Sequence, residues 1–147
     1  MSESSLRTDL LIEADGLRET LESLLGRRYG AGRRVVELKR RPSNYHSSFA
    51  IEELEVYTDD GGCLQLVFKD LSPAALLEGA LRAKPEFLYH PEREIETYRQ
   101  VLAPNNLGPN FFGSRVERGE GRYWLFLEKV SGLELYQVGD FHAWCEA

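Results

Sequence analysis

The sequence has no long hydrophobic run and very little cysteine. No stretch of its 147 residues is apolar enough to span a bilayer, and the N-terminal residues show no apolar signal segment, so we expect no membrane partner. Cys63 and Cys145 are the two cysteines, which is too few for a disulfide framework. We therefore expect reduced thiols and a cytoplasmic location.

An excess of basic residues and a metal-ligand pattern are also missing. The formal net charge is −6, whereas a nucleic-acid-binding surface normally shows a basic balance or stripe, so we expect no nucleic-acid partner. The histidines His46, His90 and His142 lie far apart without ligand spacing. The sequence therefore predicts no metal site of its own.

The apolar residues that are present predict an α+β fold. A helical stripe covers residues 6–25, where Gly16 weakens the middle enough to allow two shorter helices. Two further helices are predicted from Pro-led segments. We expect a five-stranded antiparallel sheet with the last helix packed on it; the predicted strands are 34–40, 49–57, 63–70, 110–117 and 122–130, and the later helices 73–83 and 91–102.

The third predicted strand carries a lysine at the end of an apolar run. Because side chains alternate along a strand, Leu64, Leu66 and Phe68 should face one side, and the side chains between them the other. Lys69 then needs either a partner or water, because an unpaired buried cation is very costly. The simplest interpretation is an edge strand whose lysine reaches water.

This order of elements resembles the N-terminal lobe of the protein-kinase-like superfamily, and in detail its aminoglycoside phosphotransferase and choline kinase branch. The resemblance spans residues 34–147. It rests on four short motifs: Leu66-Val67-Phe68-Lys69, residues 93–102, Leu107-Gly108-Pro109 and residues 125–132.

The resemblance implies a nucleotide site built around Lys69. In such enzymes the third-strand lysine contacts ATP phosphates, and a helix glutamate pairs with it, because triphosphate charge must be met by a cation of fixed position. Glu94 matches that glutamate by its register. Glu92 and Glu96 stay open as alternatives, and helix geometry lets only one of the three meet the lysine well.

The resemblance also implies where the base would lie. Val67 would form part of the adenine ceiling, with Leu127 behind the base. The backbone carbonyl of Glu128 and the backbone N–H of Val130 would bind the adenine edge. The turn at 43–48 departs from the glycine-rich loop of protein kinases, and its Ser and Asn residues, Ser47 among them, would supply donors to the phosphates instead.

Catalytic residues are not found in this sequence. In the family that the chain resembles, the general base and the magnesium ligands belong to the C-terminal lobe. We expect residues 1–33 to form a helical segment, residues 34–130 to form the nucleotide-binding lobe, and residues 131–147 to be the start of a missing lobe. Residues 141–147 begin an amphipathic helix too short to be stable alone. The function implied is transfer of the ATP γ-phosphate to a hydroxyl of an aminoglycoside-like or other small acceptor, with Mg²⁺ bound mainly by that missing lobe.

Two rival functions remain. One is a non-catalytic interaction module built on the same lobe, which would self-associate through Phe141 and Trp144. The other is an unrelated α+β domain in which Lys69 and Glu94 form a structural ion pair. The second rival predicts no nucleotide binding.

Overall fold

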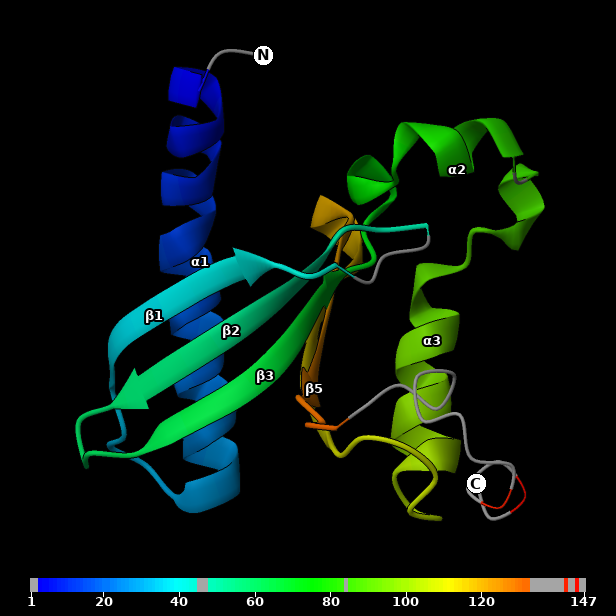
Figure 1. Ribbon diagram of the computed structural model, residues 1–147. Helices are drawn as coiled ribbons and strands as arrows, with labels where there is room; N and C mark the ends of the chain where they lie inside the picture. The colour runs from blue at the N-terminus through cyan, green and yellow to red at the C-terminus, as the bar shows by residue number, and fades with distance from the viewer. Residues whose placement is uncertain (1–2, 45–47, 84, 133–141, 143–144, 146–147) are drawn as a thin grey trace.

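A computed structural model describes residues 3–44, 48–83, 85–132, 142 and 145. It confirms the α+β fold with a five-stranded antiparallel sheet (Figure 1). The strands lie in the order β1-β2-β3-β5-β4, so β5 is inserted between β3 and β4. Their bounds are Val35–Pro42 for β1, Ile51–Thr58 for β2, Cys63–Asp70 for β3, Phe111–Glu117 for β4 and Arg122–Glu128 for β5.

The helices lie on both sides of this sheet (Figure 1). No helix in the described part of the chain is long and apolar enough to cross a membrane. Their bounds are Glu3–Tyr29 for α1, Glu78–Ala83 for α2 and Pro91–Thr97 for α3; short turns of 3₁₀-helix cover Pro73–Ala75, Glu86–Leu88 and Arg118–Glu120, and a π-helical turn covers Tyr98–Leu102.

The β2–β3 hairpin closes through a turn that contains Asp60 and Gly61. The Thr58 hydroxyl donates to Asp60 Oδ1 at 2.5 Å, and the backbone N–H of Gly62 donates to the same oxygen at 3.1 Å. Gly61 has a φ of +83°, which a side chain at Cβ would disfavour. The turn fixes the register in which Lys69 lies opposite Ile51.

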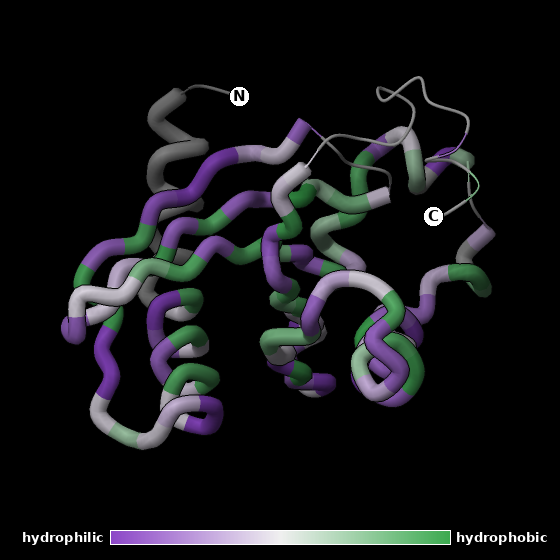
Figure 2. Tube along the Cα trace, turned by 60° about the horizontal axis from the view of Figure 1, so that its bottom comes forward, coloured by the Kyte–Doolittle hydropathy of each residue, from purple (hydrophilic) through white to green (hydrophobic). Residues whose placement is uncertain are grey.

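The larger core lies between α1 and one face of the sheet. Polar and apolar residues alternate along the strands, as Figure 2 shows, and the apolar set of this face meets the leucines of α1. Phe68 stacks on Phe126 with ring centroids 5.1 Å apart, and meets the Trp124 ring edge-on. The buried members of this cluster are Leu17, Leu21, Leu24, Leu25, Val35, Leu54, Val56, Leu66, Phe68, Trp124 and Phe126.

A smaller core lies on the opposite face, between α3 and the β3–β5–β4 part of the sheet. Ile95 of α3 is 1% exposed and packs with Leu125 and Leu127 of β5. Val67 of β3 packs against this cluster from its border. The predicted alternation along residues 63–70 is thus confirmed, because Leu64, Leu66 and Phe68 belong to the α1 side.

Three helical predictions differ from the structure. The first helix is continuous from Glu3 to Tyr29 and does not break at Gly16, whose carbonyl accepts hydrogen bonds from the Thr20 hydroxyl and from Arg115. The helix predicted over 73–83 is divided into a 3₁₀ turn and α2, because the N–H of Leu77 bonds to the carbonyl of Ser48 instead of continuing a helix. The helix predicted over 91–102 changes from α to π geometry at Tyr98.

The β1 strand forms one edge of the sheet. It carries the consecutive cations Lys39, Arg40 and Arg41 and ends at Pro42, which has no backbone N–H to donate. Cys63 and Cys145 are free thiols, and both are exposed.

Candidate functional site

The candidate site is built on an ion pair between β3 and α3. Lys69 Nζ lies 2.7 Å from Glu94 Oε1, and the lysine side chain is 21% exposed. Lys69 lies near the end of β3 and faces the α3 side of the sheet, opposite Ile51 of β2 and Leu125 of β5. The predicted pairing of Glu94 with Lys69 is confirmed as a contact between the two side chains.

Packing of α3 explains why Glu94 reaches the lysine. The next residue, Ile95, is buried against Leu125, the strand partner of Lys69, so burying the isoleucine brings the first turns of α3 to β3. A buried isoleucine is worth about 2 kcal/mol of transfer free energy. This burial therefore fixes the helix at the position where the carboxylate meets the ammonium.

The two neighbouring acids of α3 have other partners. Glu92 accepts two hydrogen bonds from Arg118 at 2.6 and 2.7 Å, and these bonds hold the pKa of its carboxyl below the ordinary value. Glu96 bonds to Arg99 and to Gln100 of the same helix. The alternatives that the sequence left open are thus resolved in favour of Glu94.

A pocket of about 350 Å³ adjoins this ion pair. Glu94 contributes to its wall, and so does the β1–β2 connection through Ser48 and Phe49. The connection is tied to the chain beyond β3, where Phe49 forms a bridge with Leu76. The remaining lining residues are Leu71, Pro73, Leu76, Leu88, Tyr89, His90, Pro91, Arg93 and Thr97.

The residues expected around a base are only partly gathered. Val67 and Leu127 lie directly opposite each other on β3 and β5, so both face the side of the sheet that carries Lys69. The Glu128 carboxylate accepts a hydrogen bond from Asn110 Nδ2 at 2.7 Å. Val130 follows β5 and is 68% exposed. Ser47 lies outside the described residues, as do His46, Phe141 and Trp144.

An ion-pair network that the sequence reasoning missed lies on the same face. Lys129 Nζ is 2.8 Å from the Glu53 carboxylate, which Arg41 also contacts. Hydrogen bonds from Lys129 and Arg41 hold the pKa of Glu53 below its ordinary value. Together with Lys39, Glu55 and Gln65 these side chains border a shallow pocket of about 190 Å³. Alternation along β2 can assign Glu53 to a face of the sheet, but it could not show that Lys129, 76 residues away, reaches it.

This arrangement can hold an anion at a fixed place. Lys69 is a cation whose position is set by Glu94, and it remains partly open to solvent. Hydrogen bonds from a charged donor to an anionic oxygen are about twice as strong as neutral ones. No three His, Cys, Asp or Glu side chains gather into a metal-binding group anywhere in the part of the chain that the structure describes.

Comparison of the chain with protein-family models, with curated proteins and with solved structures gave no match. The geometry of the site is therefore the basis for a functional assignment.

Proposed function

We propose that this chain is the nucleotide-binding lobe of a small-molecule phosphotransferase, which transfers the γ-phosphate of ATP to a hydroxyl of a small acceptor. The observation that carries the proposal is the 2.7 Å ion pair between Lys69 of β3 and Glu94 of α3. The resemblance to the aminoglycoside phosphotransferase branch assigns these same two residues to ATP binding, and the fold brings them into contact across 25 residues of sequence.

The position of Lys69 in the sheet supports a phosphate contact. Lys69 pairs with Ile51, the first residue of β2, so the β1–β2 connection leaves the sheet beside the ammonium group. In the enzymes that the chain resembles, this connection supplies hydrogen-bond donors to the phosphates. Ser48, at its described end, is 7% exposed and borders the pocket that Glu94 also lines. Cation, connection and pocket thus adjoin one another.

The lobe's own contribution to catalysis would be binding and orientation. Lys69 would meet phosphate charge, and Glu94 would keep the ammonium at one position, so that little reorganisation is needed when the ligand binds. In a complete enzyme of this kind, Mg²⁺ would neutralise charge on the phosphates, and the resemblance implies that a second lobe would hold it. The acceptor would be chosen by that lobe.

Binding of Mg-ATP by the 147-residue chain tests the proposal. We expect Lys69→Met to weaken the affinity measured by isothermal titration calorimetry by about tenfold or more, because a hydrogen bond to a charged group is worth about 1.5–3 kcal/mol. Lys39→Met is the matched control. It removes an exposed lysine of β1 that pairs with Glu37 at 3.8 Å, and should leave the affinity nearly unchanged.

The same measurement separates the proposal from a purely structural ion pair. If Lys69→Met lowers the melting temperature but binds Mg-ATP as tightly as the wild type, the pair only stabilises the fold, Lys69 does not contact the phosphates, and the proposal is wrong. Glu94→Gln provides a second variant that keeps the side-chain volume. We expect it to weaken binding less than Lys69→Met, because the ammonium remains but is no longer fixed by a carboxylate.

The rival interaction module remains a prediction of the sequence alone. It was based on Phe141 and Trp144, which lie outside the described residues.

A further inference from the structure

The face of the sheet that would receive the base is crossed by a charged side chain. Gln65, Val67 and Lys69 share this face of β3, and Val67 has Glu53 on one side and Leu127 on the other. The backbone N–H of Lys129 donates to the carbonyl of Gln65 at 3.1 Å. Lys129, the residue after the end of β5, therefore lies next to β3.

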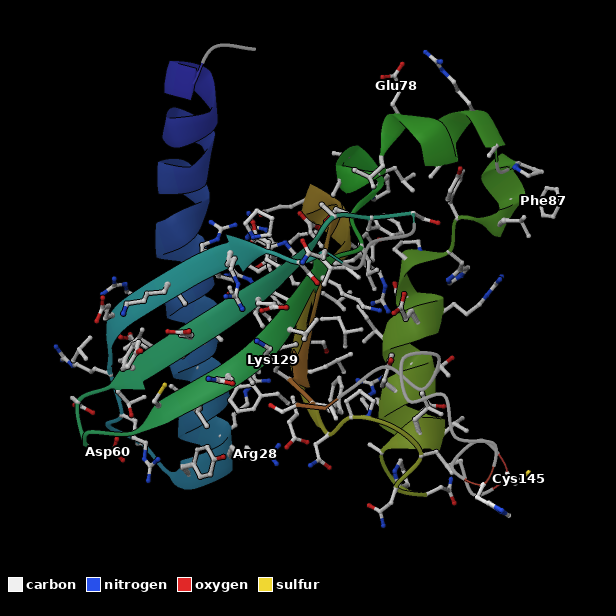
Figure 3. The ribbon with its side chains drawn as sticks, viewed as in Figure 1. Arg28, Asp60, Glu78, Phe87, Lys129 and Cys145 are labelled. Carbon is white, nitrogen blue, oxygen red and sulfur yellow. The ribbon has the colours of Figure 1, made fainter. Side chains whose placement is uncertain are left out.

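The Lys129 side chain reaches beyond β3 to the next strand. Its Nζ is 2.8 Å from the carboxylate of Glu53 on β2, and β3 is the strand that separates β5 from β2. Figure 3 shows Lys129 over β3, on the side of the sheet away from α1. The two side chains are 28% and 19% exposed, so the pair is partly withdrawn from water. Together they form a bridge across the strand that carries Val67.

We infer that the Lys129–Glu53 ion pair weakens the binding of a phosphate ligand that carries a base, relative to one that carries none. This inference rests on the proposed function. A planar base needs an apolar surface to lie on, and the half-buried Val67 offers one beside Lys69 on this face, with the buried Leu127 behind it. The bridge lies along the border of that surface and has to open or shift before a base can cover Val67.

A ligand without a base does not meet this obstacle. The proposed phosphate contact is at Lys69, two residues beyond Val67 and near the end of β3. The backbone of Lys129 meets β3 at Gln65, near the start of the strand. A bare triphosphate can therefore bind the ammonium while the bridge stays closed. The bridge should thus discriminate between ATP and inorganic tripolyphosphate.

Lys129→Ala is the cleanest way to open the bridge. Glu53 keeps its contact with Arg41 in this variant, so no carboxylate is left without a partner. Substitution of Glu53 would instead leave both cations without their shared carboxylate. Lys39→Ala is the matched control, because it removes one lysine from the border of the same shallow pocket and leaves the bridge intact.

The experiment measures the dissociation constants of Mg-ATP and of Mg-tripolyphosphate for the wild type and for Lys129→Ala, Lys39→Ala and Lys69→Met. We expect Lys129→Ala to raise the affinity for ATP relative to that for tripolyphosphate by about two- to fivefold. This range corresponds to the loss of a competing, partly exposed ion pair. Lys39→Ala should leave this ratio unchanged, since it alters only the general charge of the face.

The outcomes are distinguishable. A Lys129→Ala variant whose ratio is unchanged, or shifts in favour of tripolyphosphate, overturns the inference, and the phosphate site stands if Lys69→Met still loses both ligands. If Lys69→Met binds both ligands as the wild type does, the proposed function fails and the inference fails with it. A tightened ratio in Lys129→Ala but not in Lys39→Ala, with an unchanged affinity for tripolyphosphate, would be its strongest support.

Discussion

The two faces of the sheet differ in what covers them. On the α1 side an apolar cluster runs from the helix across β2, β3 and β5, and its members are nearly all withdrawn from water. On the other side α3 covers the β5 part, and the β1–β2–β3 part carries ion pairs such as Glu53 with Lys129. The first face holds the fold together, and the second keeps charged groups partly open to solvent.

The largest expected effect is on the α1 side. Phe126 is fully buried and stacks on Phe68, so Phe126→Ala should lower the free energy of unfolding by about 3–5 kcal/mol in chemical denaturation. Phe111→Ala is the matched change on the α3 side, where the ring is only half-buried and the loss should be smaller. Equal losses would show that both faces contribute alike to stability.

A smaller effect is expected where α1 meets β4. A Cβ added to Gly113 would lie 2.5 Å from Leu24 Cδ2, and Leu24 is itself buried. Gly113→Ala should therefore cost about 1–3 kcal/mol of unfolding free energy through overpacking. Gly119→Ala, which meets nothing within 4 Å, should stay within about 0.5 kcal/mol of the wild type. A Gly113→Ala protein of unchanged stability would mean that α1 is held less tightly than the contact implies.

The smallest effect is a loss of stability at low pH that involves ion pairs on the α3 side. The pKa values of Glu53 and Glu92 are lowered by their basic partners, so the folded state binds these protons less readily than the unfolded state. Their contribution is present above the ordinary pKa of 4.5 and is lost as pH falls through the lowered values. The melting temperature should drop as pH is lowered below about 4.5.

Arg118→Ala tests the contribution of Glu92 to this drop. The variant removes both hydrogen bonds to the Glu92 carboxylate, so its melting temperature should fall less between pH 5 and pH 3 than that of the wild type. Arg82→Ala, which breaks an exposed ion pair with Glu78 within α2, serves as the control. Parallel pH profiles for all three proteins would contradict a role of Glu92 in the acid response.

Local sequence signals predicted the strands better than the helices. Residues 63–70 alternate clearly and end in turn residues, and β3 has the predicted bounds. Proline and glycine marked helix starts and turns, but they could not show that Leu77 bonds to Ser48, since that bond depends on the β1–β2 connection being nearby. Tertiary packing therefore decided where the helix predicted over 73–83 breaks.

The site was predictable to the extent that it follows helix register. Glu94 was the acid favoured by its place in the helix, and the structure pairs it with Lys69. The Lys129–Glu53 bridge was not predictable, because it depends on β5 lying beside β3, and the order of strands in a sheet is not written in any local pattern. The pocket beside Glu94 was missed for the same reason, since its walls come from separated segments.

The charged edge of the sheet has a consequence for the behaviour of concentrated protein. An open edge strand offers unpaired backbone groups to which another chain can add by β-pairing, the first step of many aggregates. In β1 the run Lys39-Arg40-Arg41 would place like charges against each other in such a pairing, and Pro42 withholds a donor at the end of the strand. The β1 edge of the sheet is thereby protected against aggregation through strand pairing.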